Sequence, residues 1–157
     1  SVDKGYKKNL FKWQKWNSFG NVGQQMWIKA MVFQILRANV EEHRWFDSGD
    51  LQSLTMLLSI AEVARQTPLV KHWLPTKEYS IYAEYLKDNT EPDNLVVRVS
   101  ATMIDGKPSK AFRNTSTVHR NSEPLGFECK ARTRGNSCGP CRACWSREIE
   151  NISYPKH

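Results

Sequence analysis

Segments with helical periodicity alternate with short apolar segments along this 157-residue chain, and this order restricts the fold more than any other feature. Apolar residues recur every three or four positions in the helical segments, whereas the shorter segments have the composition of strands. Helices are expected at residues 22–38, 51–65 and 78–87, and strands at residues 44–47, 69–74, 95–101 and 115–119. Strands that alternate with helices are typical of parallel βαβ units. We therefore expect an α/β fold in which three to four mostly parallel strands form a partial barrel or an open sheet with flanking helices.

The ends of the expected strands carry polar side chains. In such folds, functional groups gather beyond the carboxyl ends of the strands. Asp47, Ser48 and Asp50 surround Gly49 at the first of these ends, and they are our candidate catalytic residues. Two carboxylates on one turn suit a hard cation, acid–base chemistry or a ribose. The alternative is that Ser48 or Asp50 only caps the following helix.

All four cysteines of the chain lie within sixteen residues, at Cys129, Cys138, Cys141 and Cys144. They lie in a Gly-, Pro- and Arg-rich stretch that offers no core of its own. Four thiolates on short loops are the ligand set of a zinc ion or an iron–sulfur cluster. We therefore expect a loop-rich tail with a four-cysteine metal or cluster site.

The spacing of the last three cysteines slightly favours a [4Fe–4S] cluster over zinc. Two residues separate Cys138 from Cys141 and Cys141 from Cys144, as in bacterial ferredoxins. Structural zinc sites more often use two separated Cys-x-x-Cys pairs. His119 and His157 are further candidate ligands, but four cysteines already complete a site and both histidines are expected at the surface.

The net charge of +7 is concentrated at the two ends of the chain. Residues 1–16 contain five lysines and one acidic residue, and residues 107–157 contain ten basic and four acidic residues. Basic ends are typical of proteins that bind polyanions, although they also serve as a solubilising surface. Our candidate nucleic-acid contacts are Lys12, Lys15, Arg132, Arg134 and Arg142. Two tryptophans are close to these lysines in the sequence: Trp13 lies between them and Trp16 follows Lys15. Their rings either stack on bases or pack onto the domain.

Composition and charge divide the chain into three expected regions. Residues 1–20 form a basic aromatic arm, residues 21–120 the α/β domain, and residues 121–157 the cysteine-rich tail. We find neither an apolar run long enough to span a membrane nor the pattern of a signal peptide. Because the cysteines are clustered and neither a membrane-spanning run nor a signal peptide is found, we expect the protein in a reducing cytoplasm. Glycine loops that bind nucleotides and the Gly-x-Ser-x-Gly elbow of hydrolases do not occur.

Two motifs together resemble a family of bacteriophage proteins labelled gene product 88-like. The first is Arg44-Trp-Phe-Asp-Ser-Gly-Asp50, and the second is Cys138-Gly-Pro-Cys-Arg-Ala-Cys-Trp145 with the ending Ile152-Ser-Tyr-Pro-Lys-His157. The resemblance covers residues 20–157. It implies functional positions at Ser48, Gly49 and Asp50 and at the four cysteines. Longer members have another cysteine-rich segment before the first helix, in an architecture similar in outline to radical-SAM barrels, and no cysteine of this chain matches that segment.

Three hypotheses for function follow. The first is a phage protein of the bacterial host cytoplasm that holds a metal or iron–sulfur cluster and acts by binding nucleic acid or a host protein. The second is an enzyme, or the remnant of one, with a radical-SAM-like architecture and a pocket at the strand ends. The third is a structural or host-takeover protein whose tail is held together by zinc. Neither the sequence nor the resemblance decides between an enzyme and a binding protein.

Overall fold

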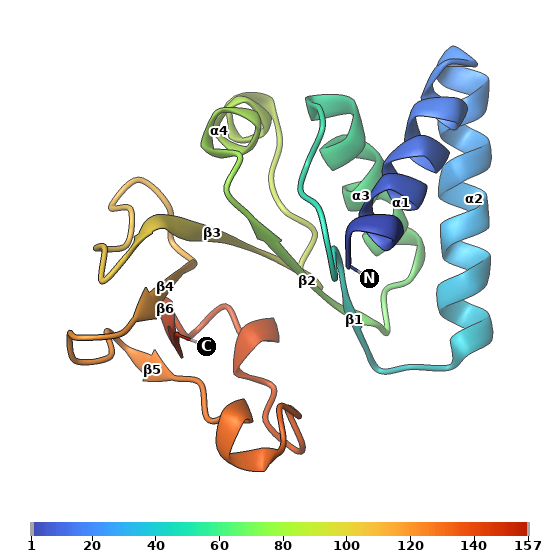
Figure 1. Ribbon diagram of the computed structural model, residues 1–157. Coiled ribbons are helices and arrows are strands. Elements are labelled where there is room, and N and C mark those ends of the chain that lie inside the picture. Colours follow the sequence, from blue (N-terminus) through green and yellow to red (C-terminus); the bar gives the residue numbers. More distant parts are fainter. Residues whose placement is uncertain (1, 157) are drawn as a thin grey trace.

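The computed structural model describes residues 2–156, with side chains for residue 7 and from residue 11 onward. Its centre is an all-parallel sheet of six strands in the order β1-β2-β3-β4-β6-β5. The sheet is curled and open, like half of a barrel (Figure 1). The strands are β1 (Glu42–Arg44), β2 (Lys71–Thr76), β3 (Leu95–Ile104), β4 (Thr115–His119), β5 (Phe127–Glu128) and β6 (Asn151–Pro155).

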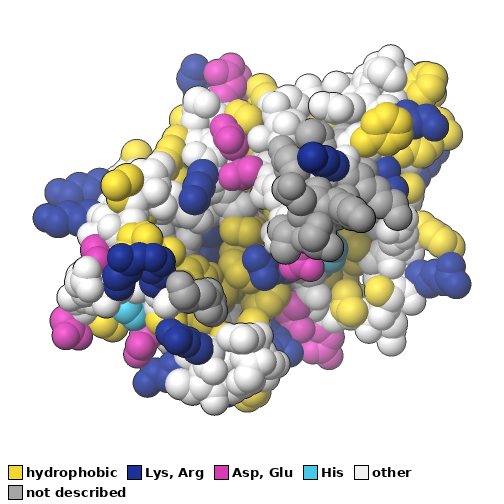
Figure 2. Space-filling model, viewed as in Figure 1, with side chains coloured by type: hydrophobic (Ala, Val, Ile, Leu, Met, Phe, Trp, Pro, Cys, Tyr) yellow, Lys and Arg dark blue, Asp and Glu magenta, His cyan; other side chains and the backbone are white. Residues whose placement is uncertain are grey.

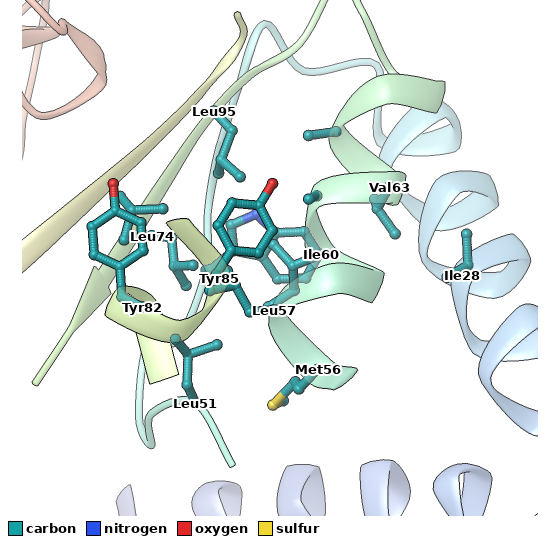
Figure 3. Close-up of a cluster of buried hydrophobic side chains, with 14 of the residues drawn as sticks. Ile28, Leu51, Met56, Leu57, Ile60, Val63, Leu74, Tyr82, Tyr85 and Leu95 are labelled. Carbon is teal, nitrogen blue, oxygen red and sulfur yellow. The ribbon is translucent and has the colours of Figure 1, made fainter. Parts of the chain in front are cut away.

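Helices cover one face of this sheet over β1, β2 and β3. They are α1 (Val2–Asn17), α2 (Gly20–Ala38), α3 (Leu54–Gln66) and α4 (Tyr79–Asp88). Helix α3 starts where the Ser53 side chain accepts a hydrogen bond from the Met56 amide at 3.2 Å, which is an N-cap. Leu57 and Ile60 on α3 are fully buried against Leu74 and Leu95 of the sheet (Figure 3). The main core therefore lies between the helices and one face of the first three strands.

The opposite face of the sheet is covered by the segment between β5 and β6. Consecutive strand residues point to opposite faces, so Leu74 faces the helices while its neighbour Trp73 packs with Cys144 and Ile152. The covering segment contains two short 3-10 helices, η1 (Ala131–Arg134) and η2 (Ala143–Trp145). Thus the four cysteines lie on the face of the sheet that the α-helices leave free.

The α/β class and the parallel sheet are confirmed, but the expected number of three to four strands is too low. Strands β1 and β5 are only three and two residues long, and β6 follows a polar loop. Strand β2 also continues through Pro75, where we expected it to end. A proline has no amide hydrogen to donate, and Pro75 tolerates this position because the paired part of β1 ends opposite Trp73.

Both ends of the chain belong to this one fold. Residues 2–17, expected in a basic arm, form α1, and its Trp13 is 3% exposed within the main core. The cysteine-rich tail supplies β5 and β6, and β6 lies between β4 and β5. Because helix α2 is apolar on most of its sides, its sequence predicts substantial burial, but only part of it is buried. Trp27, Ile28 and Ile35 are buried, while four apolar residues of the helix are exposed, namely Val22, Met26, Phe33 and Leu36. None of the helices within residues 2–156 is long and apolar enough to cross a membrane.

Candidate metal–thiolate site

The four cysteines line one small pocket, which we call the cysteine pocket. Cys129 directly follows β5, and its amide donates to the Ser153 carbonyl oxygen at 2.8 Å, which fixes this cysteine to the sheet. Cys138 and Cys141 lie on the loop between η1 and η2, and Cys144 lies in η2. The remaining wall is largely apolar and consists of Phe127, Ala131, Arg134, Ala143, Trp145 and Ile152.

A tight turn brings the second and third cysteines to the pocket. The Cys141 amide donates to the Cys138 carbonyl oxygen at 3.0 Å. Gly139 has a φ of 53°, in the left-handed region that glycine adopts at least cost. Arg142 then holds the loop to the sheet, because its Nε lies 2.8 Å from a carboxylate oxygen of Glu42 on β1. The same guanidinium donates to the carbonyl oxygens of Gly139 at 2.6 Å and Cys141 at 3.0 Å.

A buried arginine of the sheet binds the backbone around the fourth cysteine. Arg98 on β3 is 0% exposed, and its guanidinium donates to five carbonyl oxygens and to no carboxylate among residues 2–156. The acceptors lie at 2.6–3.3 Å and belong to Ala143, Cys144, Ser146, Thr115 and Glu150. Buried charges are normally paired with an opposite charge. The Arg98 charge favours the thiolate form of the neighbouring Cys144, although burial of this sulfur acts more strongly in the opposite direction.

Cys144 also makes a polar contact with Tyr154, which packs beside the pocket. The Cys144 sulfur and the Tyr154 hydroxyl are 3.3 Å apart. Burial raises the pKa of the Cys144 thiol to about 11, although the Tyr154 hydroxyl and Arg98 act in the opposite direction. Burial also raises the pKa of Tyr154. Without a metal, this sulfur is a protonated thiol, and coordination of a metal has to remove its proton.

The cysteine pocket is not preformed around a metal. Within residues 2–156, no group of three or more His, Cys, Asp or Glu side chains is placed to hold a metal ion. The free space in the pocket is about 10 Å³, roughly enough for one water-sized body. Cys138 is exposed, and Cys129 and Cys141 are half-buried. Binding of a single ion or of a cluster therefore requires the sulfur atoms to change their positions.

The candidate histidine ligand lies elsewhere. His119 is at the end of β4, with Nδ1 2.7 Å from the Ser153 hydroxyl and Nε2 3.9 Å from a Glu128 carboxylate oxygen. Ser153 is adjacent to Ile152, which lines the cysteine pocket, so His119 is on the opposite face of the sheet. His157, the other histidine considered, lies outside the described residues.

The candidate catalytic residues at the first strand end have different environments. Asp50 accepts hydrogen bonds from the Leu51 amide at 2.7 Å, the Thr76 hydroxyl at 2.5 Å and the Lys77 amide at 2.7 Å. Its carboxylate therefore ties the loop before α3 to the end of β2. Asp47 is exposed and lies 3.7 Å from Arg44. The expected helix cap is neither Ser48 nor Asp50 but Ser53.

The candidate nucleic-acid contacts are divided between two regions. Lys12 and Lys15 are exposed on α1, whereas Arg132 and Arg134 lie on η1. Arg142 is engaged with Glu42 and the cysteine loop, as described above, so its charge is already paired. Figure 2 shows several Lys and Arg side chains on the half of the molecule that contains the tail.

Sequence reasoning missed Arg98, Tyr154 and Glu42, which support the cysteine pocket. A signal for Arg98 was present, because an arginine interrupts the apolar run Leu95-Val-Val-Arg-Val99. A charged residue in a strand that is buried on both faces needs a specific partner. Glu42 and Tyr154 had no comparable signal, since their roles depend on which segments the sheet places side by side.

Comparison with known proteins identifies a family. A family model described as gene product 88 matches residues 6–147. The chain belongs to the gene product 88 family. This is a family of phage proteins, as the resemblance predicted. The match begins earlier than the resemblance did and ends before the last strand, so it does not include the ending Ile152–His157. Searches of curated proteins and of solved structures found no match.

Proposed function

We propose that this member of the gene product 88 family binds a metal–thiolate centre through Cys129, Cys138, Cys141 and Cys144, and that the centre is a [4Fe–4S] cluster. The observation that carries the proposal is the combination of four cysteines on one pocket with Arg98, a buried cation without a carboxylate partner among the described residues. A cluster or a zinc ion with four thiolates carries net negative charge. Such a centre would supply the missing counter-charge.

Two features favour the cluster over zinc. The Cys-x-x-Cys-x-x-Cys spacing suits three corners of a cube, with Cys129 at the fourth. Phe127, Trp145 and Ile152 form an apolar wall that would limit the access of water, on which the reduction potential of a cluster depends. In this site a cluster would supply electron transfer or structural support. The residues of the chain bind it, shield it and balance its charge.

Metal analysis of protein purified without oxygen tests the proposal. We expect a brown protein with iron and acid-labile sulfide in equal amounts, and loss of both in Cys141→Ser. Ser109→Ala, in the loop after β3, is the matched control and should keep the metal content unchanged. A colourless protein with one equivalent of zinc would overturn the cluster and support the third hypothesis, a zinc-held tail. A protein with neither metal would overturn the proposal altogether.

Binding to nucleic acid or to a host protein in the host cytoplasm is the way in which we propose that the protein acts. Exposed basic residues next to the cysteine pocket favour nucleic acid, because Arg132 and Arg134 lie on η1 close to Lys130. Phosphate contacts make affinity strongly dependent on salt. A gel shift with single- and double-stranded DNA and RNA at about 50 mM salt should show binding that weakens in Arg132→Ala/Arg134→Ala. Absence of any shift at that salt concentration excludes nucleic acid and leaves the host protein.

An enzyme at the strand ends is the second hypothesis. In this hypothesis the half-barrel is a radical-SAM-like architecture or its remnant, with a pocket at the strand ends. The three hydrogen bonds of Asp50 support a structural role for this residue instead. An enzymatic role predicts that Asp50→Asn abolishes ligand binding or turnover at unchanged stability. Loss of stability alone would identify Asp50 as a structural residue.

A further inference from the structure

A second pocket lies on the opposite side of the sheet from the cysteines, between α1, α2 and the end of β1. We call it the aromatic pocket. It has a volume of about 360 Å³, within the range of sites for small ligands. Its walls are formed mainly by Trp13 and Trp16 of α1, Trp27 of α2, and Trp45 and Phe46 after β1. None of the four cysteines lines it.

The aromatic side chains form a packed wall rather than a loose patch. The rings of Trp13 and Trp27 meet edge to face with centroids 5.0 Å apart, and Trp27 stacks on Trp45 at 6.2 Å. Trp13, Trp27 and Trp45 are almost fully buried, whereas Trp16 and Phe46 are half-buried. The two half-buried rings can therefore contact a ligand over a rigid aromatic floor. Flat aromatic ligands gain most from such a surface, because stacking needs only a π-face.

Few polar groups line this pocket, and they suit the edge of a heterocycle. The His43 ring contacts Trp45 and His72 edge-on and makes no hydrogen bond to any described residue. Burial lowers the pKa of His43, so the ring is neutral near pH 7 and offers both a donor and an acceptor. Gln34 adds an amide with the same two capacities.

Charge at the mouth of the pocket selects against cations. The Arg44 guanidinium lies over the Trp73 ring on the other face of the sheet and 3.7 Å from Asp47, whose charge it balances. This leaves Lys12 as the net charge among the described lining residues. Aromatic pockets that bind quaternary ammonium groups rely on the negative ring faces, and a lysine at the rim opposes such ligands. An anionic group on the ligand is favoured instead.

Backbone strain marks the same pocket. Phe46 has a φ of 54°, a conformation that is unusual for a bulky residue and that costs energy. Such strain is concentrated at binding and catalytic sites. Here it turns the chain away from β1 directly after Trp45 and places Phe46 in the wall of the pocket.

We propose that the aromatic pocket binds a nucleobase that carries a phosphate. The ring stacks on Trp16 and Phe46, His43 and Gln34 contact its edge, and Lys12 binds the phosphate. The base comes either from a free mononucleotide or from a single strand of nucleic acid. This inference is independent of the metal centre, because the two pockets share no residue and lie on different faces of the sheet.

Isothermal titration with AMP, GMP, CMP and UMP, followed also by tryptophan fluorescence, tests the proposal. We expect at least one nucleotide to bind with a Kd below about 1 mM, and the corresponding nucleoside and ribose 5-phosphate to bind more weakly. A ten-residue oligonucleotide distinguishes the sources: tighter binding than the mononucleotide identifies a single strand, and weaker binding identifies the free nucleotide. If neither the mononucleotides nor the oligonucleotide bind, the proposal is overturned.

Two pairs of variants locate the binding. Trp16→Ala should weaken binding by roughly fivefold or more, because stacking on one aromatic ring is lost, whereas Trp16→Phe should retain most of it. Lys12→Ala should weaken nucleotides but not nucleosides, and Lys15→Ala, an exposed lysine of the same helix outside the pocket, should bind like the parent. Circular dichroism confirms that each variant is folded. Equal affinities of the parent, Lys12→Ala and Trp16→Ala would place the ligand elsewhere and refute the proposal.

Discussion

Replacing Arg98 by methionine is the most informative perturbation of this molecule. The guanidinium donates to five carbonyl oxygens that belong to η2 and its flanks, to β4 and to the residue before β6. Each hydrogen bond to a charged group contributes about 1.5–3 kcal/mol, but the cost of burying the charge offsets much of that sum. Arg98→Met leaves buried carbonyl oxygens without a donor at about 1–3 kcal/mol each, and the relief from burying a charge offsets part of this, which leaves a net cost of about 3–5 kcal/mol. We expect a loss in this range for Arg98→Met, from a total of roughly 5–15 kcal/mol.

Denaturation in urea without metal measures this loss. The free energy of unfolding should fall by the stated amount for Arg98→Met and change by less than about 0.5 kcal/mol for Arg113→Met, whose exposed ion pair with Glu148 spans 3.8 Å. Hydrogen exchange should show the loss of protection in β4 and β6, which the guanidinium connects. A decrease below about 1 kcal/mol for Arg98→Met would refute the reasoning, since the five acceptors would then be satisfied without the arginine.

A lysine at the same position separates charge from geometry. Arg98→Lys keeps the positive charge but cannot reach five acceptors with a single ammonium group. If the charge of Arg98 balances a bound centre, Arg98→Lys should retain more metal than Arg98→Met at equal protein stability. Equal metal content in the two variants would show that Arg98 acts only by holding the loop in place.

Three further predictions follow from the same contacts. Burial lowers the pKa of His72 to about 4, below the value of about 6.5 in the unfolded chain, so this residue should lower the stability by about 3 kcal/mol as the pH drops from 6.5 to 4 and have no further effect below that. Urea titrations of the parent and of His72→Gln measure this contribution as the difference between the two proteins, which should change over that pH range. Cys141→Ser should abolish metal binding but keep the helical circular dichroism, because no residue of α1–α4 lines the cysteine pocket. Leu57→Ala, at a fully buried position, should cost about 2–5 kcal/mol in urea denaturation.

Apart from α1, whose residues were expected in a basic arm, the helix-covered half of the fold was predictable because the periodicity of each segment is a local property of the sequence. Strand β4 occupies residues 115–119 as expected, and the helices α2, α3 and α4 differ from the expected ranges by at most three residues at either end. The order of helices and strands then implies a parallel sheet. The largest difference among the helices is explained by Ser53, whose side chain caps α3 and places its first residue at Leu54.

The cysteine-rich half was harder to predict, since its strands are defined by their neighbours. Strand β5 has two residues and lies at the edge of the sheet, where β6 is its one partner among residues 2–156, so nothing in its own sequence distinguishes it from a loop. The site was predictable as a set of cysteines but not as a pocket. The hydrogen bond between Arg98 on β3 and the Cys144 carbonyl oxygen joins residues that are 46 positions apart in the chain. Contacts over such a separation cannot be predicted from a local sequence pattern.

The strand order explains why the cysteines lie where they do. Strands β5 and β6 are adjacent and parallel, so the chain between them must return along the sheet by a crossover. The α-helices already cover the opposite face over β1–β3, and this crossover packs instead on Trp73 and over Arg98. A crossover without a long helix has no apolar stripe to hold it in place. Arg98 on the sheet side and a ligand shared by the four cysteines would together hold this crossover against the sheet, as the apolar faces of α3 and α4 do for the crossovers after β1 and β2. Loss of either should therefore loosen the same segment.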